Sequence, residues 1–399
     1  MAAKNAPGTP GWLGAVNDRT ALALLLEHPV LTRNRIGELS GLSKPTASQI
    51  VSRLEEAGLV YVSTQITGGR GPHAAGYSVR ADRTIGVAID ITATTIHATV
   101  ADVSATEHPI VSIPVAEAHE RSAINDIRSA IDAACTAANS NPDVVRRVLV
   151  GVQGSIDPRS DELSFAETLP GWPRTGVRGH LEQELQINVA IDNDANLAAI
   201  AERTQGASAE EPGFALIWMG NGLGVSIDQN GALLRGAAGG AGEIGYLPVP
   251  ISAARIDPVA QDLQDLMGGP TVSRILRTNG VPGRTLDDRL AQLNSAPPEI
   301  RTAVLTELAP RIAHGVLPVL AVLDPGTIVL GGPTGMAGGA VLAELVRTQI
   351  RRTTRWSPNV VATTIESHPV LRGARAALVA ELRASLLDEV AAQVLSSTQ

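Results

Sequence analysis

One helical face near the N-terminus carries short polar side chains and no carboxylate. In residues 44–54 the apolar positions recur at i, i+3, i+4 and i+7, a spacing that places them on one side of a helix. They are Ala47, Ile50, Val51 and Leu54. The opposite side presents Pro45, Ser48, Gln49 and Ser52. Hydroxyl and amide groups hydrogen-bond to phosphate oxygens and to base edges, so this face predicts contact with a nucleic acid.

Residues 32–60 have the pattern of a helix-turn-helix, because a shorter helical pattern precedes this one across the tight turn Gly41-Leu42-Ser43. Ser43 can cap the second helix, and Pro45 stands in its first turn, where a missing N–H costs nothing. We expect this helix to enter the major groove of DNA, with Arg53 at a backbone phosphate. The side chains expected to face DNA are Lys44, Pro45, Thr46, Ser48, Gln49 and Arg53.

A wing follows the second helix. Residues 59–62 have the pattern of a strand, residues 68–72 that of a glycine-rich tip, and residues 77–79 that of a return strand. Arg70 at the tip is placed to enter a narrow minor groove, where negative potential attracts arginine. A solvated loop arginine is the alternative. The wing favours a DNA-binding unit over a helical hairpin that only packs against the rest of the chain.

The composition sets the limits of the fold. The 399 residues are enough for two or three domains, and aliphatic side chains must fill their cores because aromatic residues make up only 2%. We find no apolar run of the roughly 18 residues that a membrane span needs and no signal segment, so we expect a cytoplasmic protein. The single cysteine, Cys135, excludes an internal disulfide and continues an apolar helical stripe, which predicts a buried thiol.

Charge is divided unevenly along the chain. Residues 1–80 contain eight Lys and Arg against five Asp and Glu, a formal charge of +3, whereas the remainder carries −11. DNA contact therefore belongs to the N-terminal part. Because +3 is small for one DNA reader, we expect a homodimer, or a dimer of dimers, on a palindromic operator.

The chain divides into three parts. We expect residues 1–16 to be disordered, residues 17–80 to form the winged helix-turn-helix with a first helix from Asn17 to Leu26, and residues 84–390 to form an α/β body. Strands are expected at 85–90, 96–102, 110–115, 148–156, 188–192, 214–220, 223–228, 231–234 and 327–332. Helices are expected at 122–139 and near 176–186, 258–277, 300–323 and 373–388. Three strands open each half, which predicts two related lobes with a ligand cleft between them.

Four motifs in the body resemble the ROK family, which groups bacterial sugar kinases with sugar-responsive repressors. They are AIDITATT at 88–95, LPGW at 169–172 with AIDNDANLAAIAE at 190–202, MGNGLG at 219–224 with GAAGGAGEIGY at 236–246, and LDPGTIVLGG at 323–332. The resemblance spans residues 17–390, because the repressor branch carries the same winged helix. It implies an actin/hexokinase-like, ribonuclease H-like body of two lobes.

The resemblance also implies a set of ligand-binding residues. Asp194 stands where the family has its catalytic base, Asn193 where it has a sugar ligand, and Glu243 at the carboxylate of its G-E-x-G-H motif. Tyr246 replaces that motif's histidine, and alignment on Gly269-Pro270 places Gln264 at a family glutamate. The alternative for Asp194 is a cap of the following helix, with Asn193 satisfying the turn, and one side chain can do both.

The phosphate-binding side departs from the family pattern D-x-G-G-T-K. Thr92 and Ala93 replace its glycines and Thr95 its lysine. A β-branched residue forced to positive φ costs about 1–2 kcal/mol, and its bulk crowds a phosphate. In the second loop Asn221 replaces a threonine. The cysteines of the family's C-x-C-G-x-x-G-C zinc site are missing, so we expect neither zinc nor a cofactor.

We therefore predict a DNA-binding regulator, most simply a repressor, that responds to a small carbohydrate or phosphosugar in a degenerate sugar-kinase cleft and is not itself an enzyme. An active ATP-dependent sugar kinase with an appended DNA-binding domain is the alternative, and a body that serves only to dimerise is a third hypothesis.

Overall fold

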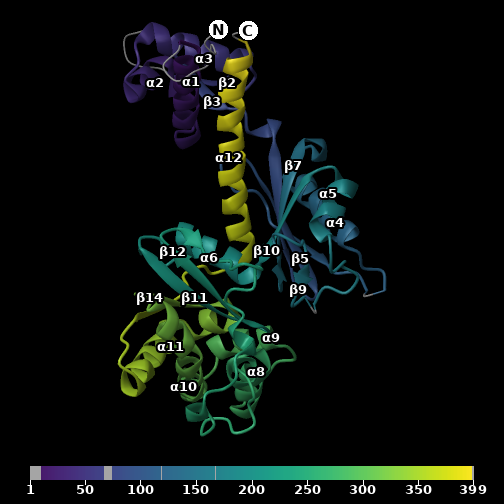
Figure 1. The fold of residues 1–399 in the computed structure, drawn as a ribbon, viewed down its shortest axis with the longest axis vertical. Coiled ribbons are helices and arrows are strands. Elements are labelled where there is room, and N and C mark those ends of the chain that lie inside the picture. The colour runs from purple at the N-terminus through teal and green to yellow at the C-terminus, as the bar shows by residue number, and fades with distance from the viewer. Residues whose placement is uncertain (1–9, 67–73, 118, 167, 398–399) are drawn as a thin grey trace.

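The computed structural model describes residues 10–66, 74–117, 119–166 and 168–397. It consists of a small N-terminal domain and two α/β lobes, joined by a long C-terminal helix (Figure 1). That helix runs from the junction of the lobes to the N-terminal domain (Figure 1).

The N-terminal domain is a winged helix-turn-helix. Its elements are α1 (Pro10–Glu27), β1 (Leu31–Thr32), α2 (Arg33–Ser40), α3 (Lys44–Glu56), β2 (Val60–Ile66) and β3 (Ala74–Val79). The strands form an antiparallel sheet in the order β1-β3-β2. The prediction that residues 10–16 are disordered is wrong, because α1 begins at Pro10 rather than at Asn17. In this added part of α1, Ala15 is buried, and further along the helix Arg19 pairs with Asp388 on the C-terminal helix at 3.0 Å.

The first lobe is built on a five-stranded sheet in the order β10-β7-β4-β5-β6. Its strands are β4 (Ile85–Ile91), β5 (Thr95–Ala101), β6 (Val111–Pro114), β7 (Val145–Val152) and β10 (Asn188–Asn193). Helices α4 (Ala123–Ala137) and α5 (Val177–Leu185) lie together on one side of the sheet (Figure 1). A two-stranded sheet of β8 (Ser155–Ile156) and β9 (Leu163–Ser164) adjoins it. Cys135 is fully buried, as predicted.

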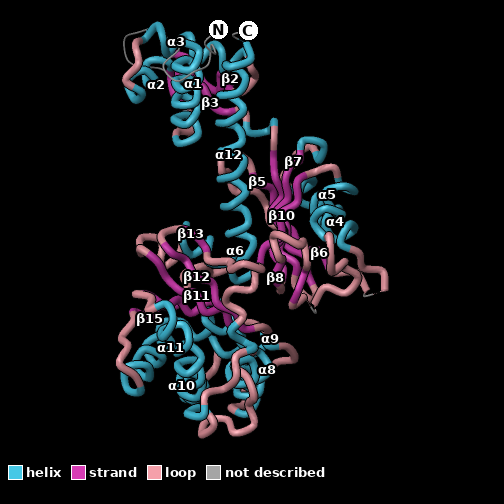
Figure 2. The backbone as a smooth tube through the Cα atoms, viewed as in Figure 1, coloured by secondary structure: helices cyan, strands magenta, loops and turns pink. Residues whose placement is uncertain are grey.

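The second lobe repeats this plan in the order β13-β12-β11-β14-β15 (Figure 2). Its strands are β11 (Gly213–Met219), β12 (Leu223–Gln229), β13 (Ala232–Leu233), β14 (Thr327–Gly331) and β15 (Asn359–Ala362). Its helices are α7 (Leu263–Met267), α8 (Gly269–Thr278), α9 (Leu286–Asn294), α10 (Pro298–Leu323) and α11 (Gly332–Thr353). The sequence predicted neither α9, α11 nor β15, and it predicted α7 and α8 as one helix, which Gly268 divides.

Helix α6 (Asp194–Gln205) follows β10 and lies at the junction of the lobes. Helix α10 has an 18-residue window apolar enough to cross a membrane, but 61% of that window is buried inside the protein, as in a core helix. Four short 3-10 turns complete the described chain: η1 (Ala81–Arg83), η2 (Pro142–Val144), η3 (Ile244–Tyr246) and η4 (Ile251–Ala253).

The C-terminal helix α12 (Pro369–Ser397) extends well beyond the predicted 373–388. It contacts β4, β5, β7 and α6 in the body and α1 in the winged helix. Leu382 and Val390 on α12 belong to the hydrophobic core of the winged helix, together with Val103 of the body. Residues 382–390 of α12 are therefore part of the winged-helix core as well as of the body.

Candidate effector cleft and nucleic-acid interface

A cavity of about 350 Å³ lies where the two lobes meet, and all five predicted ligand residues line it: Asn193, Asp194, Glu243, Tyr246 and Gln264. They come from the end of β10, the start of α6, the turn η3 and helix α7. The structure thus brings together side chains that are up to 71 positions apart in the sequence. A concave site with a few convergent polar groups suits a small polar ligand.

Asn193 is the cap of α6, and Asp194 is its first residue. The Asn193 Oδ1 accepts from Ala195 N at 2.9 Å, and its Nδ2 donates to Gly154 O at 3.0 Å. The Asp194 carboxylate accepts from the same Ala195 N–H at 2.8 Å. Both side chains therefore accept from the Ala195 N–H at the start of α6, with Asn193 at the N-cap position.

The Asp194 carboxyl has a pKa close to neutral pH. Burial raises its pKa to about 7, and the charge of Glu243 adds to the rise, while hydrogen bonds from the Ala195 amide and the Trp218 side chain oppose it. Such a carboxyl accepts a hydrogen bond from a ligand hydroxyl when ionised, and it can take up a proton near neutral pH. The geometry fits recognition of a neutral polyol and also fits a general base.

Aromatic residues that sequence reasoning missed complete this cavity. Trp218, at the end of β11, and Phe165 both line it. The Phe165 ring lies 5.1 Å from the ring of Tyr246, which is 59% exposed. Gln264 donates its side-chain N–H to Asn221 O at 2.7 Å, so its amide joins α7 to the glycine-rich loop 220–224. In a chain so poor in aromatics, a tryptophan at the end of a buried strand was the available signal.

A second cavity of about 920 Å³ lies on the other side of Asp194, where the family resemblance places nucleotide phosphates. Among the described residues that line it there is no lysine or arginine. The acidic side chains are Asp90, Asp194, Glu202, Asp287, Asp288 and Glu366. Burial, with a contribution from the charge of Asp194, raises the pKa of Asp90 to about 7.

The turn between β4 and β5 is closed by hydrogen bonds to the side chain of Thr92. The Thr92 hydroxyl accepts from Thr94 N at 3.4 Å and Thr95 N at 3.0 Å, and Thr92 N donates to Thr95 O at 2.9 Å. The backbone strain that we expected at Thr92 and Ala93 is absent, because neither residue has a positive φ. The N–H groups of Thr92, Thr94 and Thr95 are thus occupied within the turn.

In the winged helix, α3 is built as the sequence predicted. Ser43 caps it by accepting from Thr46 N at 3.3 Å, and the four apolar residues Ala47, Ile50, Val51 and Leu54 are buried. Lys44, Pro45 and Gln49 are exposed. Thr46 and Ser48 are half-buried, and Ser48 accepts from Arg33 Nη1 at 3.1 Å.

Arg53 makes a contact within the winged helix that the sequence did not predict. Its guanidinium donates two hydrogen bonds to Asp18, whose side chain is 1% exposed, and these bonds raise the pKa of Arg53. Arg53 thus ties α3 to α1, a contact between residues 35 positions apart that no local pattern reveals. Arg33, which the sequence did not indicate, lies beside Ser48 and over the Tyr77 ring at 5.2 Å. Arg70 lies outside the described residues.

The fold and the cleft define a class of protein, in which a winged helix-turn-helix is joined to a two-lobed body of the sugar-kinase type. The chain belongs to the ROK family, whose model matches residues 86–381. Residues 17–71 match the model of the MarR family, in agreement with the winged helix.

Similar proteins include both repressors and kinases. The chain is 23% identical over 355 residues to a xylose repressor of Caldicellulosiruptor bescii, which covers 84% of this chain and 87% of that protein. It is 27% identical over 201 residues to a beta-glucoside kinase of Klebsiella pneumoniae, which covers 46% of this chain and 63% of the kinase.

Solved structures show the same fold. A ROK family transcriptional regulator, a homologue of the E. coli MLC protein, superposes with a TM-score of 0.67 at 16% identity and covers 96% of this chain and 99% of its own. A ROK family glucokinase from Streptomyces griseus, in complex with glucose and AMPPNP, has a TM-score of 0.58 at 21% identity and covers 73% and 98%. The regulator accounts for nearly the whole chain and the kinase for three quarters of it.

Proposed function

We propose that this chain is a transcriptional repressor whose DNA affinity is set by a small carbohydrate or phosphosugar bound between the lobes. The observation that carries the proposal is helix α12, which lines the larger cavity at Pro369 and Val370 and enters the winged-helix core at Leu382 and Val390. The two cavities share Asp194 and Trp218, so one helix runs from beside the proposed effector site to the winged helix. The repressors among the relatives support this reading.

The effector occupies the smaller cavity. Asn193, Asp194, Glu243 and Gln264 supply carbonyl, carboxylate and amide groups for hydroxyls, and Tyr246 with Phe165 supplies apolar surface for a sugar ring. A ligand that prefers one arrangement of the lobes shifts the population of that arrangement and, through α12, the pose of the winged helix. Several relatives are named xylose repressors, so a pentose is the first compound to test.

The DNA partner is an operator read by α3. Lys44, Pro45, Thr46, Ser48 and Gln49 form the proposed reading surface, and Arg33 joins it in place of Arg53. Arg70 keeps its proposed minor-groove role. The positive charge of one winged helix is small for a DNA reader, which supports a homodimer on a palindromic site. We place this complex in the cytoplasm.

A sugar kinase is the second candidate, and one observation favours it: Asp194, with a pKa of about 7, lies in the cleft where a general base is needed. Against it stand the turn closed by Thr92 and a second cavity without a lysine or arginine among its described lining residues. Phosphoryl transfer depends on such positive and N–H groups to stabilise the phosphates. The lack of that support makes a regulator without phosphotransfer the better conclusion.

One experiment tests both the repressor and the kinase hypothesis. The full chain is incubated with ATP, Mg²⁺ and a panel of pentoses and hexoses, and ADP is measured; in parallel the same sugars are screened by thermal shift. We expect stabilisation by one or more sugars without ADP above the level of the Asp194→Asn variant. ADP formation that Asp194→Asn abolishes would establish the kinase. Stabilisation by no sugar would favour a body that only dimerises.

A further inference from the structure

Residues 247–262 form a long loop beside the effector cavity. The residues at its two ends, Tyr246 and Gln264, line that cavity. The ends are held by backbone hydrogen bonds from Val249 N to Gln261 O and from Leu263 N to Leu247 O, each at 2.9 Å. Much of the tip is in solvent: Ile251 is 93% exposed and Val259 80% exposed. Apolar packing of these side chains contributes little to holding the loop.

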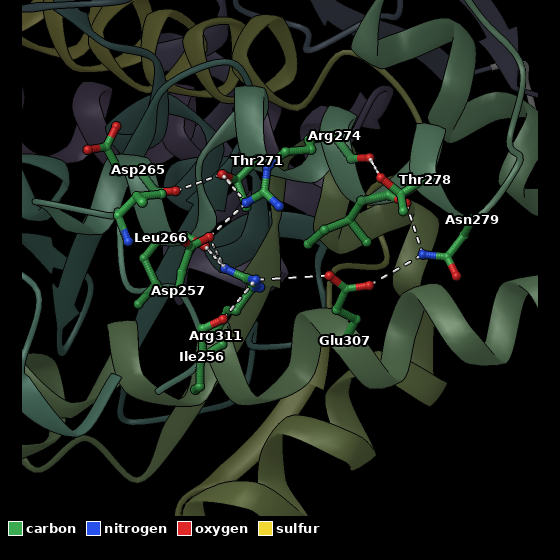
Figure 3. A network of polar contacts seen from close by, with 12 residues as sticks. Ile256, Asp257, Asp265, Leu266, Thr271, Arg274, Thr278, Asn279, Glu307 and Arg311 are labelled. Carbon is green, nitrogen blue, oxygen red and sulfur yellow. Dashed lines mark hydrogen bonds and ion pairs between the residues drawn. The ribbon is translucent and has the colours of Figure 1, made fainter. Parts of the chain in front are cut away.

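The loop is held by the fully buried Ala253, which packs into the core of the lobe, and by a buried ion-pair cluster (Figure 3). The Asp257 carboxylate, in the loop, accepts from Arg311 Nη1 of α10 at 2.9 Å and from Arg274 Nη2 of α8 at 2.7 Å. The Arg311 side chain is 5% exposed and that of Asp257 is 7% exposed. Arg311 also donates to Leu266 O at 3.2 Å and to Ile256 O at 3.4 Å. One guanidinium thus joins α10, the loop and α7, the helix that carries Gln264.

The charges within the cluster compensate one another. Burial by itself would raise the pKa of Asp257, but the hydrogen bond and charge of Arg311 outweigh it and lower the pKa, so the carboxylate is ionised at neutral pH. Glu307 lies 3.9 Å from Arg311 and accepts from Asn279 at 3.3 Å. Removing one partner of such a pair leaves a buried charge without compensation, which is strongly unfavourable.

The family resemblance places a zinc site in this part of the chain, and the residues present do not fit it. The only cysteine of the chain is Cys135, in the other lobe. Within the described ranges, no group of three or more His, Cys, Asp or Glu side chains is arranged to hold a metal ion. The loop therefore has its shape from another source.

We infer that the cluster of Asp257, Arg311 and Arg274 takes the structural place of that metal and thereby positions Tyr246 and Gln264 at the effector cavity. Asp257 acts as a positioning residue, because it touches neither the cavity nor a ligand there. That this cavity binds an effector rests on the proposed function. The effect of the cluster on the loop can be tested without DNA and without any sugar.

The test is hydrogen exchange of the full chain, followed at the amides of Val249 and Leu263 and, as an internal reference, at the amides of β4 in the other lobe. We expect Asp257→Asn to speed exchange of the two loop amides about tenfold or more and to leave β4 unchanged, because only the local opening becomes easier. Asp257→Asn combined with Arg311→Met removes both buried charges and should recover much of the protection. Glu307→Gln, at the edge of the cluster, is the matched control and should have no effect.

Three results would overturn the inference. The first is unchanged exchange of Val249 and Leu263 in Asp257→Asn. The second is an equal rise in the loop and in β4, which would show global destabilisation. The third is stoichiometric zinc in the purified protein whose removal by a chelator opens the loop. A failure of the DNA or sugar experiments would leave this result intact, so the two proposals fail separately.

Discussion

Arg383 of helix α12 donates a hydrogen bond to the carbonyl of Leu26, in the last turn of α1, at 3.1 Å. Its Nε donates at the same time to Val103 O in the body, at 2.7 Å. The carbonyls in the last turn of a helix lack partners within the helix, and a guanidinium is well suited to satisfy them. One side chain therefore connects the DNA-binding domain, the C-terminal helix and the first lobe.

Arg383→Met should loosen the winged helix on the body. We expect operator affinity to fall about tenfold, because a freer domain loses more orientational entropy on binding, while the body keeps its stability. The matched control is Arg375→Met on the same helix, since Arg375 donates only to Ala105 O and Thr106 O of the body. Fluorescence anisotropy with a labelled operator measures both variants. Equal losses in the two would contradict a special role for Arg383.

The pair of Arg53 and Asp18 should matter for stability more than for DNA binding. Arg53→Met leaves the buried Asp18 carboxylate without its partner, and we expect a loss of about 2 kcal/mol in the free energy of unfolding of the winged helix. Asp18→Asn with Arg53→Met should recover part of that loss. Urea denaturation measures the stability. If Arg53→Met keeps its stability but loses DNA affinity, the original expectation of a phosphate contact at Arg53 is restored.

The buried Asp90 predicts a pH dependence of stability. Its pKa of about 7 in the folded protein lies above the ordinary value of 3.8, so the folded state binds more protons than the unfolded state between these values. The free energy of unfolding should therefore fall as the pH rises from about 4 to about 7. Asp90→Asn should remove the part of this fall that Asp90 causes, while Asp194, whose pKa is also raised to about 7, keeps its own part. The free energy of unfolding of the variant should exceed that of the wild type by on the order of 2–4 kcal/mol at pH 8, with the smallest difference at pH 4.

Asp287→Asn is the control for that experiment, because Asp287 lines the same cavity but is exposed. Thermal unfolding from pH 4 to pH 8 provides the measurement. Parallel curves for Asp90→Asn and wild type would refute the assignment of the raised pKa to Asp90.

The proposed DNA-reading face of α3 predicts that two substitutions weaken DNA binding in different ways. Gln49→Ala should reduce the binding free energy for the best operator by about 1–3 kcal/mol. It should also relax the preference at one base position, because the two hydrogen bonds of a glutamine amide to a base edge discriminate between bases. Lys44→Ala should weaken binding on all sequences and make the salt dependence less steep. Competition binding over a panel of operator variants separates the two. Unchanged affinity and preference in Gln49→Ala would place the reading face elsewhere.

The parts of the protein that depend on local spacing could be predicted from the sequence. The buried face of α3 follows from a repeat of 3.6 residues, whereas the cleft residues were predicted from motifs that resemble the ROK family. The contacts that join distant segments could not be predicted. Arg53 with Asp18, Arg383 with Leu26 and Asp257 with Arg311 join segments 35, 357 and 54 positions apart.

The turn at Thr92 shows a different limit of sequence reasoning. The resemblance predicted that Thr92 and Ala93 stand where the family has glycines, and the inference of strain assumed that the backbone of the family turn was kept. A threonine hydroxyl can close a turn by accepting from the next N–H groups. The chain uses this option, and neither Thr92 nor Ala93 adopts a positive φ.

The most direct test of the central proposal is operator binding by the full chain in the presence of single sugars. A duplex selected from a random library is titrated with wild type and with Asp194→Ala, each with and without the sugars of the panel. We predict that at least one sugar weakens the wild-type complex about fivefold or more and leaves the Asp194→Ala complex unchanged. Binding of no selected duplex, or a sugar response that persists in Asp194→Ala, would contradict control of DNA binding from this cleft.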